Sequence, residues 1–337
     1  MVSSNNKEVV SELSPILRVY KDGTVERFFN SPHAPPSPLG NTTGVLSKDI
    51  AITPDISARL YLPKLAPSAN QKLPILVYFH GGGFCIESPF SILCHRYINS
   101  IVSQSNVIAV SVDYRLAPEH PLPVAYQDSW AALQWVASHI TTTKTTKMDS
   151  WLIRHGDFNR VYLGGDSSGA NIAHNMAMQA GIETLHGDMK IYGLFLCQPY
   201  FCGSKLFGKE SLVEKRLLHE TWMFVYPDAK GGIDNPMINP FAYGSPRLSQ
   251  IQCHRLFVCV ASKDELRERG VYYCNAVKES GWKGEVDLYE VEGEGHAFHF
   301  FDFDGEKAQD MRQKELSTGA ESFTRQTPRF TRRHLIG

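Results

Sequence analysis

The motif Gly165-Asp166-Ser167-Ser168-Gly169 is the feature that most restricts how this chain can fold. It follows the apolar run VYLG and opens an amphipathic stretch, so it predicts a strand, a tight turn and a helix. Only glycine fits on either side of a serine in such a turn, which holds the serine hydroxyl out from the sheet edge. Ser167 is therefore the candidate nucleophile. The alternative is a glycine- and serine-rich helix start in which Ser167 is only an N-cap.

Short apolar runs alternate with longer amphipathic stretches from about residue 45 onward. Several runs are apolar throughout, which is typical of strands buried on both faces of a parallel sheet. We expect crossover helices over 122–139, 168–181 and 266–280. The alternation predicts an α/β fold with a doubly wound, mostly parallel sheet. The expected strands are SARLYL (57–62), PILVYF (74–79), VIAVSV (107–112), VYLG (161–164), YGLFL (192–196), LFVCVA (256–261) and VDLYEV (286–291).

Two stretches interrupt this alternation before the C-terminal end. Residues 1–45 form a polar, proline-rich lead-in that we expect to be extended and to contain no core helix. Residues 200–250 carry glycine, proline and aromatic residues between two expected strands. We interpret them as an insertion over the carboxyl edge of the sheet, where ligands bind in such folds.

The C-terminal segment 304–337 is polar and weakly periodic. Met311 and Leu316 form no apolar stripe in it, so we expect a last helix to begin near residue 305 and to end by about 318. The main domain would then cover residues 46–318. Residues 319–337 form an atypical tail for which disorder is one interpretation.

Composition excludes several classes of function. Hydrophobic residues make up 42% of the 337 residues and the formal charge is −1, so neither disorder nor a nucleic-acid partner is expected. No apolar run approaches the roughly 18–20 residues that span a bilayer, and MVSSNNKEVVSELSP does not resemble a secretory signal. We therefore expect a cytoplasmic protein without a membrane partner. The seven scattered cysteines fit buried small side chains better than disulfides (Cys85, Cys94, Cys197, Cys202, Cys253, Cys259 and Cys274).

A second motif, His80-Gly81-Gly82-Gly83, directly follows the run PILVYF. A strand that ends in three glycines leaves bare N–H groups facing a pocket, and successive N–H groups can bind an anion. Acyl transfer requires such donors near the developing oxyanion. The alternative is a flexible loop with a capping histidine, which the position of the motif upstream of Ser167 makes less favourable.

A serine nucleophile needs a base, and the base needs a carboxylate that orients it. His296 follows the last expected strand in the glycine-rich turn EGEGHAF, whereas the rival His299 lies among HFFDF and is expected to pack. Asp264 comes at the end of the strand LFVCVA and is favoured over its rival Glu265. Asp264 could also be a simple helix N-cap. The two histidines have no obvious third ligand, so neither a metal nor another cofactor is expected.

These residues resemble the hormone-sensitive-lipase-type branch of the α/β-hydrolases, and more narrowly a plant carboxylesterase. The similarity covers about residues 12–303, and its nearest likeness is to legume 2-hydroxyisoflavanone dehydratases and related carboxylesterases. The matching blocks are long and in the family's order. They are VYKDGTVERF (19–28), YRLAPEHPLP (114–123), HGDFNRVYLGGDSSGANIAHN (155–175), YPDAKGGIDNPMINP (226–240) and KESGWKGEV (278–286), besides the two glycine motifs.

The resemblance implies a role for each matching position. Ser167 would be the nucleophile, Asp264 the orienting acid and His296 the general base. A cap would be built from the N-terminal segment 1–45 and an insertion at about 200–235, covering an apolar pocket. The oxyanion hole would be formed by N–H groups of Gly82, Gly83 and Ser168, with Gly81 shaping the glycine loop and His80 supporting it.

Three functions follow as hypotheses. The first is hydrolysis of small carboxylic esters, which serine at position 167 favours, because the related dehydratases often carry threonine there. The second is removal of water from a 2-hydroxyisoflavanone, a flavonoid-like substrate, which requires mainly a base and an oxyanion site. The third is non-catalytic hormone binding, since gibberellin receptors resemble this family but lack the triad histidine that His296 provides here. The tail beyond 304 departs from the family's usual amphipathic last helix.

Overall fold

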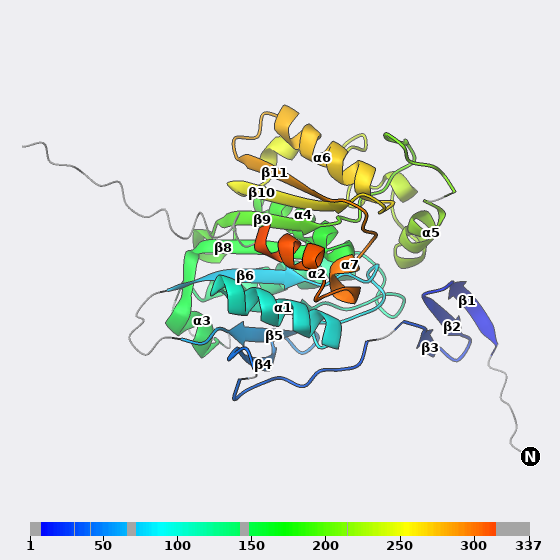
Figure 1. Cartoon of the computed structure of the whole chain (residues 1–337). Coiled ribbons are helices and arrows are strands. Elements are labelled where there is room, and N and C mark those ends of the chain that lie inside the picture. The colour runs from blue at the N-terminus through cyan, green and yellow to red at the C-terminus, as the bar shows by residue number, and fades with distance from the viewer. Residues whose placement is uncertain are drawn as a thin grey trace, which may run out of the picture.

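The computed structural model describes residues 8–29, 31–40, 42–65, 72–141, 148–213 and 215–314. Its centre is an eight-stranded sheet in the order β11-β10-β9-β8-β6-β7-β5-β4 (Figure 1). Neighbouring strands are parallel except where β5 pairs with β4 and with β7, which confirms the predicted mostly parallel sheet. The edge strand β4 was not predicted. The strands are Leu46–Ala51 (β4), Ser57–Leu62 (β5), Leu73–Phe79 (β6), Ile108–Asp113 (β7), Gly156–Asp166 (β8), Ile191–Cys197 (β9), Arg255–Ala261 (β10) and Glu285–Val291 (β11).

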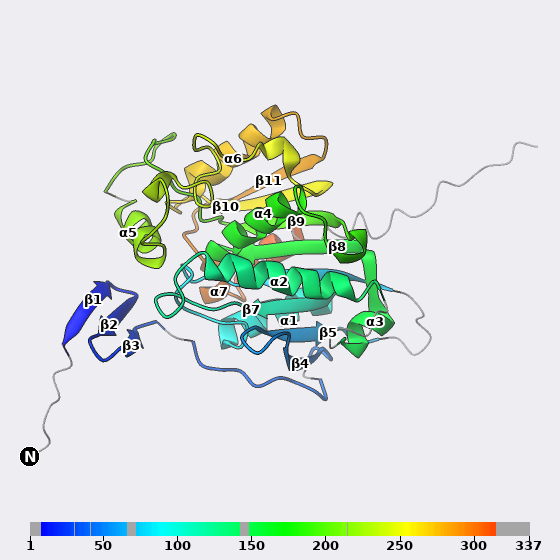
Figure 2. The same ribbon diagram turned by 180° about the vertical axis from the view of Figure 1, so that it is seen from behind.

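Helices cover both faces of this sheet. Figures 1 and 2 show α1 (Ile92–Ser105) and α7 (Phe298–Phe301) on one face and α2 (Val124–Ser138) and α4 (Ser168–Ala180) on the other. The predicted helices at 122–139, 168–181 and 266–280 correspond to α2, α4 and α6 (Arg267–Glu279), whereas α1 was not predicted. The remaining helical elements are α3 (Ser150–His155) and the 3₁₀ turns His186–Asp188, Gly232–Asp234 and Leu248–Gln250.

Two separate cores result from this layering. Because side chains alternate along a strand, Ile75 and Val77 of β6 pack in the core on the α2 and α4 side, and Tyr78 packs in the core on the α1 side. All seven cysteines are free and buried, which confirms their interpretation as small apolar side chains. None of the helices within the described ranges has both the length and the apolar composition to cross a membrane.

The N-terminal lead-in contains an antiparallel sheet of its own, formed by β1 (Val9–Leu13), β2 (Leu17–Tyr20) and β3 (Val25–Arg27). This sheet was not predicted, although the extended backbone was. It packs against α5 (Arg216–Val225) of the insertion, and both lie at the same end of the main sheet (Figure 1). Arg27 fastens it to the body by a bidentate pair with Glu119 and by a hydrogen bond from its Nε to the carbonyl of Cys85 at 2.7 Å.

A last helical segment covers residues 306–314 of the described chain, close to the predicted start at 305. The sequence analysis considered Met311 only together with Leu316, whereas the structure packs Met311 with a different residue. Met311 is fully buried with Ala308 in the core beside α1, and its Sδ lies 3.9 Å from the Sγ of Cys197. Two apolar residues one helical turn apart are therefore enough to pack this helical segment against the existing core. Leu316 and the tail 319–337 lie outside the described residues.

Candidate active site

Ser167 occupies the sharp turn between β8 and α4. Its backbone has φ 51° and ψ −118°, a conformation that a side chain adopts only at a cost of about 1–3 kcal/mol. The turn is held by hydrogen bonds from Ser167 N–H to the carbonyl of Cys197 at 2.9 Å and from Tyr200 N–H to the carbonyl of Ser167 at 3.0 Å. A Cβ on Gly165 would lie 2.3 Å from the backbone of Gly169, so the flanking glycines are required sterically.

The structure brings Ser167, His296 and Asp264 into one chain of hydrogen bonds. His296 Nε2 lies 2.9 Å from Ser167 Oγ, and His296 Nδ1 lies 2.8 Å from Asp264 Oδ2. Since an ionised carboxylate only accepts, Nδ1 carries the proton and Nε2 is free to accept from the serine hydroxyl. Burial lowers the pKa of His296, but the charge of Asp264 and its hydrogen bond outweigh burial, so the pKa lies above the ordinary 6.5.

The two rival residues lie elsewhere. Glu265 is exposed at the rim of the cavity, whereas Asp264 is buried and also accepts from Leu266 N–H at 3.0 Å through its second oxygen. His299 is fully buried between Tyr97 and Phe300, and burial lowers its pKa to about 3. Of the two candidates in each pair, the structure therefore places His296 against Ser167 and Asp264 against His296.

The glycine loop lies beside the same turn. Gly81 N–H donates to Asp166 Oδ1 at 3.0 Å, so this N–H is already engaged. Gly82 and Gly83 have φ angles of +106° and +59°, and within the described residues neither N–H donates to another group. Ser168 is the first residue of α4, so its N–H precedes the helical hydrogen bonds. Three N–H groups are therefore available here, two from the loop and one from the helix start.

His80 lies beneath the loop. Its ring stacks on Tyr114 at 4.3 Å between centroids, and the Tyr114 hydroxyl donates to the carbonyl of His80 at 2.6 Å. Burial lowers the pKa of His80 to about 4, so the ring stays neutral. A further link joins the loop to the helix, because Phe84 N–H donates to Ser168 Oγ at 3.3 Å.

Gln198 is a buried residue at this site that the sequence analysis missed. Its side-chain amide donates to the carbonyl of Gly295 at 3.1 Å and accepts from Ala297 N–H at 2.7 Å. Gln198 thus holds the backbone on both sides of His296. Its only sequence signal is its position directly after β9, which does not reveal a partner about a hundred residues away.

A cavity of about 400 Å³ opens above Ser167 and His296, within the usual range for small-molecule sites. Its walls come from the small N-terminal sheet and its connections, the glycine loop, the start of α1, α5 of the insertion and the segment around α7. These walls are largely apolar. The apolar lining residues are Pro15, Ile16, Phe29, Ile86, Leu93, Leu217, Leu218, Ala297, Phe300 and Phe301.

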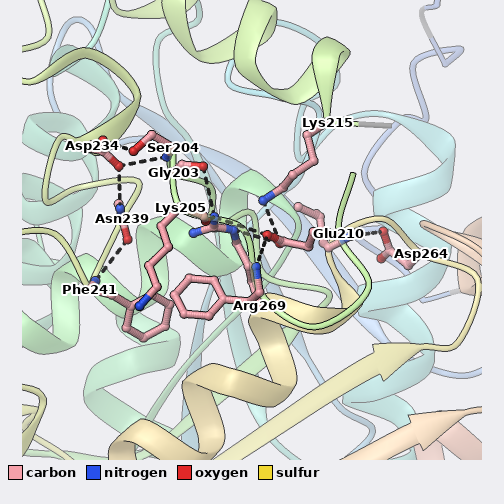
Figure 3. A network of polar contacts seen from close by, with 12 residues as sticks. Gly203, Ser204, Lys205, Glu210, Lys215, Asp234, Asn239, Phe241, Asp264 and Arg269 are labelled. Atoms are coloured by element: carbon pink, nitrogen blue, oxygen red, sulfur yellow. Dashed lines mark hydrogen bonds and ion pairs between the residues drawn. The ribbon is translucent and has the colours of Figure 1, made fainter. Parts of the chain in front are cut away.

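A buried ion cluster fastens the insertion beside Asp264. Figure 3 shows Lys215 and Arg269 pointing toward Glu210, at distances of 2.6 Å and 2.9 Å from its Oε1. Arg269 on α6 also donates to the carbonyls of Gly203 and Lys205. All three charged side chains are almost completely buried, so the segment before α5 is held firmly against the helix that follows Asp264.

Comparison with known proteins decides the family. A model of the alpha/beta hydrolase fold matches residues 76–300. The chain belongs to the α/β-hydrolase fold family. A 2-hydroxyisoflavanone dehydratase of Glycyrrhiza echinata is 55% identical over 92% of this chain and 95% of its own length. Probable carboxylesterase 13 of Arabidopsis thaliana is 41% identical over 91% and 96%.

A solved α/β-hydrolase is similar as well. The esterase of Pyrobaculum calidifontis has a TM-score of 0.64 and 26% identity, covering 82% of this chain and 85% of its own. The predicted resemblance to plant carboxylesterases and 2-hydroxyisoflavanone dehydratases is confirmed, and this α/β-hydrolase is an enzyme.

Proposed function

We propose that this α/β-hydrolase is a serine esterase that cleaves small carboxylic esters. The observation that supports the proposal most is the unbroken hydrogen-bond chain from Ser167 through His296 to Asp264. A hydroxyl is a weak nucleophile until a base removes its proton, and this chain supplies the base and its orienting carboxylate. The raised pKa of His296 suits a group that accepts and later returns a proton.

The reaction would proceed in two halves. Ser167 Oγ attacks the ester carbonyl while His296 takes its proton, and the same proton then goes to the departing alcohol. A water molecule, activated by His296, then attacks the acyl-enzyme and releases the acid. In both halves the N–H groups of Gly82, Gly83 and Ser168 would stabilise the negative oxygen. Gly81 would shape the loop through its bond to Asp166, and His80 would support it.

The substrate would be largely apolar. The N-terminal segment and α5 would together act as a cap, because both contribute apolar side chains to the cavity above Ser167. An apolar wall favours hydrocarbon or aromatic groups through burial from water, at about 25 cal/mol per Å². No metal or organic cofactor enters this scheme.

A second candidate is dehydration of a 2-hydroxyisoflavanone. It is supported by the name of the Glycyrrhiza echinata relative at 55% identity and that of a Glycine max relative at 51%. His296 would remove the proton next to the ketone while the loop N–H groups hold the ketone oxygen as an enolate. The enolate would then re-form the ketone and a carbon–carbon double bond as the neighbouring hydroxyl takes the proton back from His296 and leaves as water. This scheme uses the same base and loop without an acyl-enzyme on Ser167.

Turnover of the two substrate types distinguishes the candidates. The kcat/KM of wild type, Ser167→Ala and the surface control Ser100→Ala would be measured on p-nitrophenyl butyrate and on a 2-hydroxyisoflavanone. The esterase proposal requires butyrate hydrolysis that falls by about 10³-fold or more in Ser167→Ala and is unchanged in Ser100→Ala. Efficient dehydration with negligible ester hydrolysis would favour the second candidate, and a folded enzyme inert toward both substrates would contradict both candidates.

A further inference from the structure

The charged groups that line the cavity all have the same sign. Within the described part of the chain, three carboxylates line the cavity, Glu87, Asp166 and Glu265, and no lysine or arginine does. A cleft with apolar walls and charges of one sign concentrates their field on whatever is bound inside. The three carboxylates therefore favour a negative potential in the cavity.

Glu87 differs from the other two carboxylates. Both Tyr78 O–H and Gly81 N–H donate to Asp166, and Glu265 is exposed at the rim. In contrast, the Oε2 atom of Glu87 is shielded from water and has no hydrogen-bond partner among the described residues, while Oε1 accepts only from Ser31 Oγ at 2.7 Å. The residue as a whole is half-buried and lines the cavity, so a charge on its carboxylate that no ion pair of the described residues offsets acts on whatever is bound there.

The backbone also fixes Glu87 in place. Its φ angle is +67°, an uncommon conformation for a residue with a side chain. Ser31, which belongs to the N-terminal lead-in, donates its hydroxyl to this carboxylate. The hydrogen bond from Ser31 therefore holds the carboxylate at the cavity wall.

We propose that Glu87 is a specificity-determining residue, which makes the site select uncharged or cationic substrates and reject those that carry a carboxylate. The inference rests on the proposed esterase function and adds the charge class of its substrates. The acid released by ester hydrolysis is itself an anion, so the same field would lower its affinity and favour its release. A unit charge on a substrate about 10 Å from Glu87, at an effective dielectric constant of about 20, changes kcat/KM relative to an uncharged substrate roughly tenfold.

Three esters with the same leaving group and chain length test this inference. They are p-nitrophenyl hexanoate, mono-p-nitrophenyl adipate and p-nitrophenyl 6-(trimethylammonio)hexanoate, which are neutral, anionic and cationic. The wild type is expected to prefer the neutral ester over the anionic one by at least about tenfold in kcat/KM. Glu87→Gln keeps the shape of the side chain and an acceptor for Ser31. It should lower the neutral-to-anionic ratio of kcat/KM by about tenfold, and it should also lower kcat/KM for the cationic ester relative to the neutral one. Glu220→Gln, an exposed carboxylate outside this cavity, should leave the ratio unchanged.

Binding to Ser167→Ala separates this inference from the esterase proposal. Dissociation constants of 4-phenylbutanamide and 4-phenylbutanoate, measured by calorimetry, report the charge preference without turnover. A wild type that hydrolyses the neutral and the anionic ester with equal kcat/KM would overturn the role of Glu87 and leave the esterase proposal intact. An enzyme that hydrolyses none of the esters, yet binds the amide at least about tenfold more tightly than the acid, would overturn the esterase proposal and leave the role of Glu87 intact. Equal binding of the two ligands, or an unchanged ratio in folded Glu87→Gln, also contradicts the inference.

Discussion

The N–H of Gly81 donates to the Oδ1 of Asp166 at 3.0 Å, joining two motifs that lie 85 residues apart in the chain. Tyr78 donates to the same oxygen at 2.6 Å, so Asp166 links β6, the glycine loop and the turn that holds Ser167. Burial raises the pKa of Asp166 to about 6, even though both donors favour the ionised form. The residue before the candidate nucleophile therefore fixes the loop relative to Ser167.

Replacing Gly81 by alanine should disrupt this link. The added Cβ would lie 2.2 Å from Asp166 Oδ2, so the loop or the carboxylate must move. Displaced N–H groups stabilise an oxyanion poorly, and we expect kcat for ester hydrolysis to fall by about 10²-fold. Steady-state kinetics of Gly81→Ala would be compared with Gly281→Ala, whose Cβ meets nothing within 4 Å; its φ of +83° makes that variant less stable, so both are assayed as folded protein. Equal kcat values in the two variants would contradict this role.

The pH dependence of kcat/KM should report His296. The imidazole acts as a base only when neutral, so activity rises with pH through its pKa. Burial lowers this pKa but Asp264 raises it further, which places the midpoint of the acid limb above 6.5. In Asp264→Asn the lowering effect of burial remains, so the midpoint should move to lower pH while kcat falls by about 10⁴-fold. A pH–rate profile whose acid limb does not move in Asp264→Asn would show that another group titrates.

Gln198 should act as a positioning residue for His296. Leucine at this position removes both hydrogen bonds to the turn around His296, and a displacement of about 1 Å can cost 10²-fold in rate. We expect kcat to fall 10- to 100-fold with KM nearly unchanged, because Gln198 does not line the substrate cavity. Gln198→Glu keeps the acceptor for Ala297 N–H, so its kcat should lie between that of Gln198→Leu and that of the wild type. A change confined to KM would exclude this role.

The buried cluster around Glu210 should matter for stability. Glu210→Gln leaves the buried cations Lys215 and Arg269 without their carboxylate, and removing one partner of a buried pair costs about 3–5 kcal/mol of unfolding free energy. Glu220→Gln breaks the exposed pair with Arg216 and should change stability little. Urea unfolding of both variants measures the difference. Equal stabilities would indicate that the cluster is not required to hold the insertion.

Periodicity was sufficient to predict seven of the eight strands of the main sheet and three of its helices, because most of these strands are apolar runs, whereas the edge strand β4 was missed. The small sheet β1–β3 was missed because its strands are short and only Leu13 and Leu17 in them are buried, so they carry no apolar run. Ser167, His296 and Asp264 could be chosen from motif context and chain order. Gln198 and Glu87 could not, because their significance lies in contacts with backbone and side chains far away in the chain.

Covalent trapping of the nucleophile is the most direct test of the esterase proposal. Diethyl p-nitrophenyl phosphate would be incubated with wild type and Ser167→Ala, and the proteolytic peptides analysed by mass spectrometry. We expect the wild type to lose activity and to gain one diethylphosphoryl group on the peptide containing Ser167, and the variant to gain none. Labelling at another residue, or full activity after exposure to the reagent, would contradict the assignment of Ser167 as the nucleophile.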